Sequence, residues 1–210
     1  MKPITLHIVD RNRSNIEAIR RCFPDVNTMC ADINQATGYD VLITPGNSFG
    51  IMDGGFDAVV KTLFGASIEE KIRTAIDDEF HGKLPVGCAV CCGNATGPDV
   101  IYAPTMRVPM QITRTDNVYL AMRAALLWIS RYNDYETAGE HEPQYIENVM
   151  TPLLGAGAGK MPALQAATQM RLAWDSIYGD RRYKRPANLQ EADAIQAAIG
   201  LGLGGDPDHF

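Results

Sequence analysis

The sequence predicts an α/β domain in which helices cover both faces of a central sheet. Apolar, β-branched runs alternate along the chain with longer amphipathic segments, which is the order of strands and helices in such sheets. The continuous apolar run at residues 39–44 (YDVLIT) suits a strand that is covered on both faces. The chain has 210 residues, 46% of them hydrophobic, and is therefore long enough to bury a full core.

The N-terminal part is expected to supply three strands and three helices. Ser14 is the expected N-cap of the first helix, and Ser67, with Glu70 three residues further on, that of the third. The turn-forming residues 45–48 (PGNS) should end the third strand. In chain order we expect a strand at 4–9, a helix at 14–22, strands at 26–30 and 39–44, and helices at 56–64 and 67–78.

The alternation continues in the C-terminal part. Asp116 is expected to cap a helix, the polar stretch 131–141 to form a surface loop, and Pro162 to occupy the first turn of a later helix. Asn188, with Glu191, should open a last helix. The expected elements are strands at 86–92 and 100–103, a helix at 116–130, a strand at 147–154 and a helix that runs to about residue 178.

Charge and apolar runs exclude several classes of protein. Acidic residues number 25 and basic residues 19, so the formal charge is −6, whereas a general nucleic-acid binder is usually basic. No apolar run approaches the roughly 20 residues of a membrane-spanning helix. The chain enters a strand-like run at once, without the apolar core of a signal peptide. We expect a cytoplasmic protein with no membrane partner and no general nucleic-acid binding.

The five cysteines are typical of small buried residues in a reducing cytoplasm. A zinc site is the alternative reading, but the four histidines are scattered and none repeats at ligand spacing. We therefore predict no metal site. The cysteines are Cys22, Cys30, Cys88, Cys91 and Cys92.

Two glycine-rich loops after strands are the most informative feature for function. They are residues 44–57 (TPGNSFGIMDGGFD) and 154–162 (LGAGAGKMP). Ligands of open α/β sheets bind where strands end and helices begin, and glycine amides there can approach an anion closely. Two such turns facing one crevice could hold a pyrophosphate. Neither loop ends in the Gly-Lys-Ser/Thr of a Walker A motif, and the second lacks the later acidic residue of a dinucleotide-binding site.

Asn47 and Asp57 are the candidate chemical groups of the first loop. Asn47 offers both a donor and an acceptor to ribose hydroxyls. Asp57 follows two glycines at the start of a helix, where a carboxylate can accept a hydrogen bond from a sugar hydroxyl or a water. The alternative is structural, because the helix dipole alone favours Asp53 and Asp57 in a first turn.

Three stretches in this order and spacing resemble the macro domain, the ADP-ribose-binding fold. They are residues 47–60 (NSFGIMDGGFDAVV), 103–109 (APTMRVP) and 155–162 (GAGAGKMP), and the likeness covers roughly residues 4–178. More narrowly, the chain looks like the prokaryotic and phage group described as ADP-ribose-1''-phosphate-processing proteins. The resemblance implies a three-layer α/β/α fold with a mixed sheet of about six strands. It implies a macro domain over 1–178 and a helical or irregular appendage over 179–210.

The resemblance also implies roles for individual residues. Asp32 matches the acid that hydrogen-bonds the adenine amino group, and the Ile33 backbone N–H follows it. Asn47 matches the distal-ribose asparagine, and Asp57 matches the aspartate that positions or activates water in hydrolytic members, so these two are the predicted catalytic residues. The other predicted ligand-binding residues lie in the two loops: Ser48, Gly54, Gly55, Phe56, Leu154, Gly155, Ala156, Gly157, Ala158, Gly159 and Met161.

The chain departs from the family pattern at two positions. Thr44 stands where the family usually has another asparagine, and Gly159 where it often has an aromatic residue over the distal ribose. Met161, two positions further on, is expected either to fill that space or to leave it open. The aromatic residue that stacks on adenine in the family is unassigned, with Phe23, Tyr178 and Tyr183 as candidates.

The resemblance implies an enzyme that binds ADP-ribose and hydrolyses a group from its distal ribose, with no cofactor. The substrate would be ADP-ribose-1''-phosphate, a mono-ADP-ribosylated protein or a related signalling nucleotide. The alternative is a non-catalytic reader or sequestering protein for such nucleotides, which Thr44 and Gly159 keep open. A purely structural α/β domain is a third reading. The basic residues Arg181, Arg182, Lys184 and Arg185 are expected to form a solvated face, or to approach a phosphate-bearing ligand.

Overall fold

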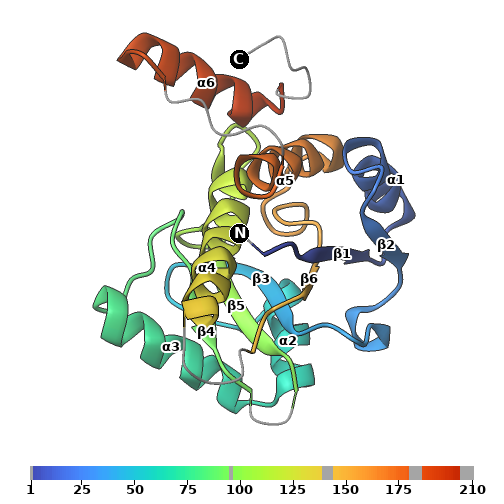
Figure 1. Ribbon diagram of the computed structural model, residues 1–210, viewed down its shortest axis with the longest axis vertical. Coiled ribbons are helices and arrows are strands. Elements are labelled where there is room, and N and C mark those ends of the chain that lie inside the picture. Colours follow the sequence, from blue (N-terminus) through green and yellow to red (C-terminus); the bar gives the residue numbers. More distant parts are fainter. Residues whose placement is uncertain (1, 95–96, 139–143, 180–185, 204–210) are drawn as a thin grey trace.

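A six-stranded mixed sheet forms the centre of the molecule (Figure 1). The computed structural model describes residues 2–94, 97–138, 144–179 and 186–203. The strand order is β2–β1–β6–β3–β5–β4, with the first five strands parallel and β4 antiparallel to β5, which confirms the expected mixed sheet. The strands are β1 (Thr5–Asp10), β2 (Asn27–Cys30), β3 (Val41–Asn47), β4 (Val90–Cys92), β5 (Asp99–Met106) and β6 (Asn148–Thr151).

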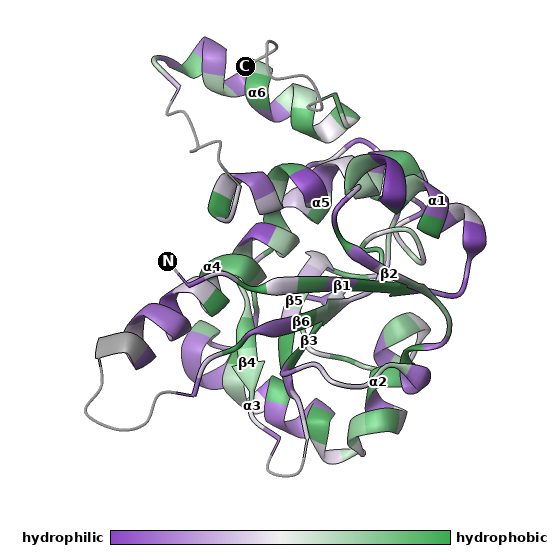
Figure 2. Ribbon diagram, turned by 45° about the vertical axis from the view of Figure 1, so that its right-hand side comes forward, coloured by the Kyte–Doolittle hydropathy of each residue, from purple (hydrophilic) through white to green (hydrophobic). Residues whose placement is uncertain are grey.

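Helices cover both faces of the sheet and complete three layers (Figure 2). One core lies between the sheet and α1 (Arg13–Cys22), α4 (Asn117–Ala138) and α5 (Ala163–Ile177). The other lies between the sheet and α2 (Gly55–Phe64) and α3 (Ser67–Phe80). Successive side chains of a strand point to opposite faces, so Val41 and Ile43 enter the first core and Leu42 enters the second. A short 3-10 helix, η1 (Ile33–Gln35), follows β2.

Two of the expected helix caps are wrong. The side chain of Asn12, not Ser14, caps α1, because its Oδ1 accepts a hydrogen bond from the Ser14 N–H at 2.9 Å. Helix α3 starts after Ala66, with Ser67 already inside the helix and no side-chain cap. In both cases the prediction falls one or two residues too late, because serine suits the first turn as well as the cap.

Strand β3 is longer than expected and continues through Pro45 and Gly46 to Asn47. Strand β6 pairs with β3 at Val41 and Leu42 alone. On that side of β3, Pro45 therefore has no neighbouring strand, and its missing N–H breaks no hydrogen bond of the sheet there. On its other side β3 stays paired with β5 up to Asn47 opposite Met106. Strand β4 is shorter than expected and begins only at Val90.

Helix α4 continues to Ala138, so the prediction of a loop from residue 131 is wrong for residues 131–138; the rest, 139–141, lies outside the described residues. Residues 131–138 look polar in the sequence because several of them are exposed, but the inner face of this part of α4 is hydrogen-bonded to the chain before β6. Asn133 is buried, and its carboxamide donates to the Ile146 carbonyl at 2.8 Å and accepts from the Ile146 N–H at 2.9 Å. Trp128 and Tyr132, one helical turn apart, stack with their ring centroids 5.3 Å apart.

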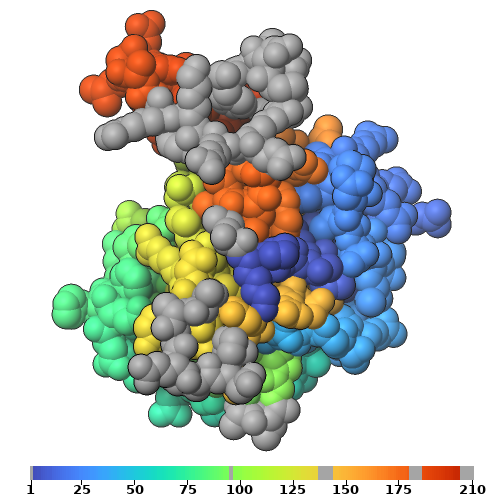
Figure 3. All heavy atoms as spheres, in the orientation of Figure 1, coloured from blue at the N-terminus to red at the C-terminus, as the bar shows by residue number. Residues whose placement is uncertain are grey.

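The last helix, α6 (Leu189–Leu201), packs against α5, beyond the body of the molecule in the space-filling view (Figure 3). Its predicted cap is confirmed, since Asn188 Oδ1 accepts from the Glu191 N–H at 2.9 Å. Two glutamines of α5 bind its C-terminal end. Gln165 donates to the Gly200 carbonyl, and Gln169 to the Ile199 carbonyl at 3.0 Å. A domain boundary at residue 178 stays a prediction, and the basic residues Arg181, Arg182, Lys184 and Arg185 lie outside the described residues.

Gln169 should contribute strongly to stability, because it is fully buried and joins three elements. Its amide also donates to the Thr115 carbonyl at 2.7 Å, and its Oε1 accepts from the Tyr119 N–H at 3.1 Å. We expect Gln169→Leu to lower the free energy of unfolding by about 2–4 kcal/mol, since several buried backbone groups lose their partner. Urea unfolding measures this. The exposed Gln196→Leu on α6 is the control, expected within about 0.5 kcal/mol of the wild type.

Candidate functional site

A cavity of about 840 Å³ opens at the carboxyl ends of the five parallel strands. Loops from all five strands line it, because parallel strands end at the same edge of a sheet. Asp32 follows β2 at one end, and Met106 closes β5 at the other. Adjacent strands lie about 4.8 Å apart, so four strand spacings give the cavity a length of roughly 19 Å.

Most of the predicted ligand-binding residues line this cavity, and its two glycine-rich loops, far apart in the sequence, face one space. Their contact with a ligand stays a prediction. The predicted residues in the wall are Asp32, Ile33, Asn47, Gly54, Gly55, Phe56, Asp57, Gly155, Ala156, Gly157, Ala158 and Gly159.

The structure does not bring Ser48, Leu154 and Met161 to the cavity wall. All three side chains are buried, and Leu154 and Met161 belong to the core beneath α4 and α5. The Ser48 N–H donates to the Arg107 carbonyl at 3.1 Å, and its carbonyl accepts from the Leu84 N–H at 2.9 Å. Met161 supports the second loop from inside, with its N–H on the Gly155 carbonyl at 3.1 Å, and therefore does not fill the distal end of the cavity.

The second loop is packed tightly at both ends and free in the middle. A Cβ at Gly155, whose φ is +76°, would collide with Val118, and one at Gly159 would collide with the Gly155 carbonyl and with Ile112. A Cβ at Gly157 would meet nothing within 4 Å. In the described part of the chain, the amides of residues 156–159 donate to no other group. Such a turn is suited to binding an anion.

The first loop presents a similar set of amides at the start of α2. Gly54 is the N-cap residue and Gly55, with φ +59°, the first helical residue. The first N–H groups of a helix have no partner within the helix, and the helix dipole adds partial positive charge there. Among the described residues, the N–H groups of Gly54 and Gly55 donate to no other group, and both residues line the cavity. A Cβ at either glycine would meet nothing within 4 Å.

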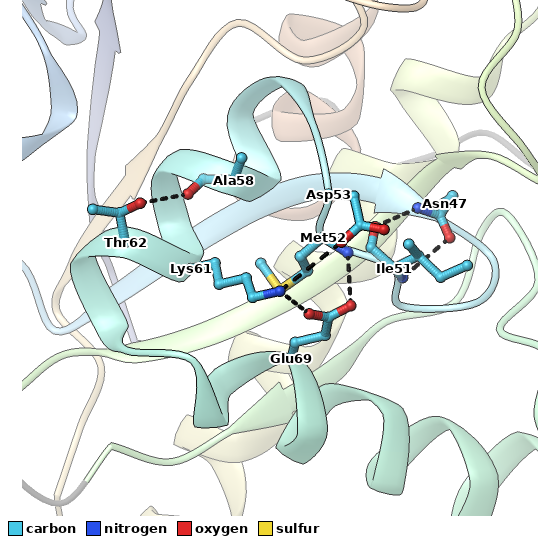
Figure 4. A network of polar contacts seen from close by, with 8 residues as sticks. All are labelled: Asn47, Ile51, Met52, Asp53, Ala58, Lys61, Thr62 and Glu69. Atoms are coloured by element: carbon cyan, nitrogen blue, oxygen red, sulfur yellow. Dashed lines mark hydrogen bonds and ion pairs between the residues drawn. The ribbon is translucent and has the colours of Figure 1, made fainter.

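Asn47 holds the loop that follows β3. Its Nδ2 donates to the Ile51 carbonyl at 2.7 Å, and its Oδ1 accepts from the Phe49 N–H at 3.0 Å. Figure 4 shows this side chain turned back onto Ile51. The second hydrogen of its amide can still serve a ligand. The predicted role at the ribose is therefore joined by a structural role that the sequence did not indicate.

Tyr102 is a supporting residue that the sequence analysis missed. Its hydroxyl accepts from the Asn47 N–H at 2.8 Å and donates to the Asn47 carbonyl at 3.0 Å. The ring fits only because residue 46 is glycine, since a Cβ there would overlap the phenol. Tyr102 is fully buried, and burial raises the pKa of its hydroxyl. A tyrosine within an apolar strand is the one signal that could have pointed to this contact.

Asp57 is buried beside Thr44 in the wall of the cavity. The Thr44 hydroxyl donates to Asp57 Oδ1 at 3.3 Å, and the Asp57 residue is only 8% exposed. Burial raises the pKa of Asp57 to about 7; the Thr44 hydrogen bond opposes this change and the charge of Glu69 adds to it. A carboxyl group with a pKa near neutrality can accept or donate a proton at physiological pH. The threonine noted as a departure from the family pattern is thus a direct partner of Asp57.

Glu69 joins the first loop to α2 and α3. Its Oε1 accepts from the Met52 N–H at 3.2 Å, and its carboxylate forms an ion pair with Lys61 (Figure 4). Lys61 also lies 3.9 Å from Asp53. The Lys61 hydrogen bond lowers the pKa of Glu69, so this carboxylate remains ionised. The network fixes the segment that leads into the open amides of Gly54 and Gly55.

The β2–β1 end of the cavity carries an ion pair. Arg11 Nε lies 3.3 Å from Asp32 Oδ1, and both side chains are substantially exposed. The two described candidates for adenine stacking, Phe23 and Tyr178, do not line the cavity. Phe23 is a core residue, Tyr178 stacks on Trp174, and Tyr183 lies outside the described residues. In the described part of the chain, the aromatic residues that line the cavity are Phe49 and Phe56.

The five thiols are free, but the expected burial is wrong for Cys30, which is exposed, whereas Cys92 is buried and the other three are half-buried. Burial raises the pKa of Cys91 and Cys92, which makes them poor nucleophiles. Over the described residues, no group of three or more His, Cys, Asp and Glu side chains could hold a metal ion. No helix in the described part of the chain has the length and apolarity to span a membrane.

The chain belongs to the Macro domain family, whose model matches residues 43–170. An uncharacterized protein of Aquifex aeolicus is 35% identical over 133 residues, which cover 62% of this chain and 70% of that protein. An uncharacterized protein of Aeropyrum pernix is 32% identical over 142 residues, covering 67% of this chain and 66% of that protein.

Solved structures share the fold. The macrodomain of Mycobacterium tuberculosis DarG has a TM-score of 0.56 at 17% identity, covering 70% of this chain and 87% of its own. A mutant of the Oceanobacillus iheyensis macrodomain with ADPR has a TM-score of 0.57 at 16% identity, and the match covers 72% of this chain and 76% of that one. The same macrodomain with ADP has a TM-score of 0.57 at 15% identity, and the match covers 72% of this chain and 75% of that one. These likenesses confirm the macro-domain fold that the sequence resemblance implies.

The burial of Asp57 predicts a pH-dependent effect of Asp57→Asn on stability. The pKa of Asp57 in the folded state is raised from the ordinary value of 3.8 to about 7. Its contribution to the stability of the folded state is therefore most favourable below pH 3.8 and is lost as the pH rises to about 7. Asparagine carries no charge at any pH. We expect the stability of the variant relative to the wild type to rise between pH 4 and pH 8, by about 4 kcal/mol at most. Urea unfolding at several pH values measures this, and a constant difference would contradict it.

Proposed function

We propose that this protein binds ADP-ribose or a derivative in the cavity and hydrolyses a group from its distal ribose. The observation that carries the proposal is the convergence of two sets of open amides, at Gly54–Gly55 and at residues 156–159, on one cavity. Together they suit a diphosphate. Membership of the Macro domain family supports this ligand class, as do the solved Oceanobacillus iheyensis structures with ADPR and ADP.

The order of the strands gives the ligand a direction. Asp32 at the β2 end would accept a hydrogen bond from the adenine amino group, with the Ile33 N–H beside it. The diphosphate would lie across the middle strands, between the two sets of amides. The distal ribose would then lie near Asn47 and Asp57, at the β3–β5 end.

Asp57 would supply the chemistry as a general base. Its carboxylate would take a proton from a water whose oxygen attacks C1'' of the distal ribose, while the bond from C1'' to the leaving group breaks. A base with a pKa near the working pH is suited to this role, and such bases typically contribute about 10²–10⁴-fold in rate. The Thr44 hydroxyl would hold the carboxylate in place.

A non-catalytic reader of ADP-ribose derivatives is the second candidate. It is favoured by the limited access to Asp57, which is only 8% exposed, and by the engagement of the Asn47 side chain in its own loop. A reader would bind ADP-ribose tightly and release no product. Incubation with ADP-ribose-1''-phosphate and with a mono-ADP-ribosylated protein, followed by product analysis, distinguishes an enzyme from a reader.

We also propose that the protein acts in the cytoplasm, because five free thiols suit a reducing compartment.

Gly157→Val provides the direct test of the ligand site. The added side chain would project into open space, so the fold should keep its stability while the amides of the second loop become covered. We expect the affinity for ADP-ribose, measured by calorimetry, to fall at least tenfold. Gly93→Val is the control, because a Cβ at Gly93 has one distant neighbour and this residue does not line the cavity. Unchanged binding by Gly157→Val would contradict the site.

Asp57→Ala should reduce turnover far more than affinity. We expect kcat to fall by about 10²–10³-fold and the Kd of ADP-ribose to change by less than about threefold, because the group acts on water. In the wild type, kcat should rise with pH through about 7, since the base must lose its proton. Steady-state kinetics across pH 5–9 measure both effects. Equal activity in the variant would remove Asp57 from the mechanism.

Asp32→Ala should weaken ligands that contain adenine and spare those that do not. ADP-ribose should bind about tenfold more weakly, whereas ribose 5-phosphate should be unaffected, since only the adenine amino group would use this carboxylate. Calorimetry with both ligands measures the difference. Asp25→Ala, an exposed acid outside the cavity, is the matched control. A uniform loss for both ligands would argue against the adenine contact.

A further inference from the structure

Four apolar residues surround the β3–β5 end of the cavity, and we call them the apolar rim: Phe49, Ile51, Val108 and Pro109. Phe49 is 39% exposed, Ile51 44% and Val108 51%. Single exposed apolar side chains are normal on a protein surface, but a group of them at the mouth of a cavity is typical of a contact surface. This group lies beside Asn47 and at the distal end of the proposed ligand path.

The apolar rim is held in place by hydrogen bonds. The Asn47 carboxamide bonds to the backbone of both Phe49 and Ile51. The Ser48 N–H donates to the Arg107 carbonyl at 3.1 Å, which joins the loop after β3 to the loop after β5. The two halves of the apolar rim therefore have a fixed separation, as a preformed subsite requires.

Charge at this end of the cavity is unsuited to a phosphate group. The charged residues that line this end are Asp53 and Asp57, both acidic. Among the described residues that line the cavity, Arg11 is the one basic residue, and it lies at the opposite end in an ion pair with Asp32. Arg107 and Lys160 are exposed neighbours in sequence that do not line the cavity. Lys61 lies 3.9 Å from Asp53 but does not line the cavity either. Within the described residues, a dianion placed here would therefore meet acidic groups and no cation of the wall.

We propose that the apolar rim receives an uncharged aromatic group attached to C1'' of the distal ribose, in preference to a 1''-phosphate. This inference rests on the proposed function and names its substrate class. In the hydrolysis, the oxygen of water would bond to C1'', the bond from C1'' to the oxygen of the aromatic group would break, and that oxygen would keep the electron pair. Asp57 takes a proton from the water, and the aromatic group leaves as a phenolate, which becomes a phenol by taking up that proton from Asp57 or one from solvent.

Two ligands that resist hydrolysis test this preference. They are the phenyl thioglycoside of ADP-ribose, with sulfur on C1'', and ADP-ribose carrying a 1''-methylenephosphonate. We expect the phenyl thioglycoside to bind about tenfold more tightly than ADP-ribose, because the ring buries apolar area against the apolar rim. The phosphonate should bind no more tightly than ADP-ribose. Calorimetry measures the three affinities. Equal affinities of the phenyl and phosphonate ligands, or a preference for the phosphonate, would overturn the inference.

A substitution in the apolar rim should reverse the preference. Val108→Lys adds a cation at an exposed position, so the phosphonate should bind several-fold more tightly and the phenyl ligand more weakly than to the wild type. Leu201→Lys, 57% exposed on α6, adds the same charge away from the cavity and should leave the ratio unchanged. An unchanged ratio in Val108→Lys would overturn the inference. Absence of ADP-ribose binding to the wild type would instead overturn the proposed function, so the two failures are distinguishable.

Discussion

The pair of hydrogen bonds between the Tyr102 hydroxyl and the backbone of Asn47 determines where the candidate site begins. These bonds fix the end of β3 against β5, and Gly46 leaves the space that the phenol ring needs. The loop that starts at Asn47 contains the first set of open amides and half of the apolar rim. Its far end is fixed by Glu69, through the Met52 N–H. The segment from Asn47 to Met52 is thus held at both ends by buried or ionised side chains, and the free amides of Gly54 and Gly55 follow it at the start of α2. These amides therefore need little ordering when a ligand binds.

The second loop depends on packing that reaches to the end of the described chain. The Gly159 carbonyl accepts from the Ile112 N–H at 2.9 Å, and Ile112 fills the space next to Gly155 and Gly159. The segment after Ile112 is bound by Gln165 and Gln169 of α5, which also bind the end of α6. Helix α6, expected as an appendage, therefore shares its hydrogen-bond partners with the segment that supports the second loop.

The sequence predicts those features that depend on local periodicity and misses those that depend on tertiary partners. Apolar runs indicate the strands, and glycines after two of them indicate the loops that meet at the cavity. The cap of α1 is misplaced by two residues because Asn12 and Ser14 are both good cap residues, and only the fold selects between them. The contacts of Tyr102 with Asn47 and of Glu69 with Met52 join residues that are distant in the sequence. The role of Phe49 depends on its place in the wall of the cavity. No spacing rule indicates such contacts.

Asp57 joins the stability of the fold to the chemistry that we propose. The burial that raises its pKa to about 7 disfavours the ionised form, so the folded state is less stable above neutrality than it would be with a neutral residue there. A fully exposed carboxylate would avoid this cost, but it would be a weaker base at the same pH. The Thr44 hydroxyl donates to the carboxylate and lowers the pKa that burial raises, so the pKa of Asp57 lies between those of an exposed carboxyl group and a buried one without a partner. Burial remains the larger effect, and the threonine reduces both the basicity of Asp57 and the stability that its ionisation costs.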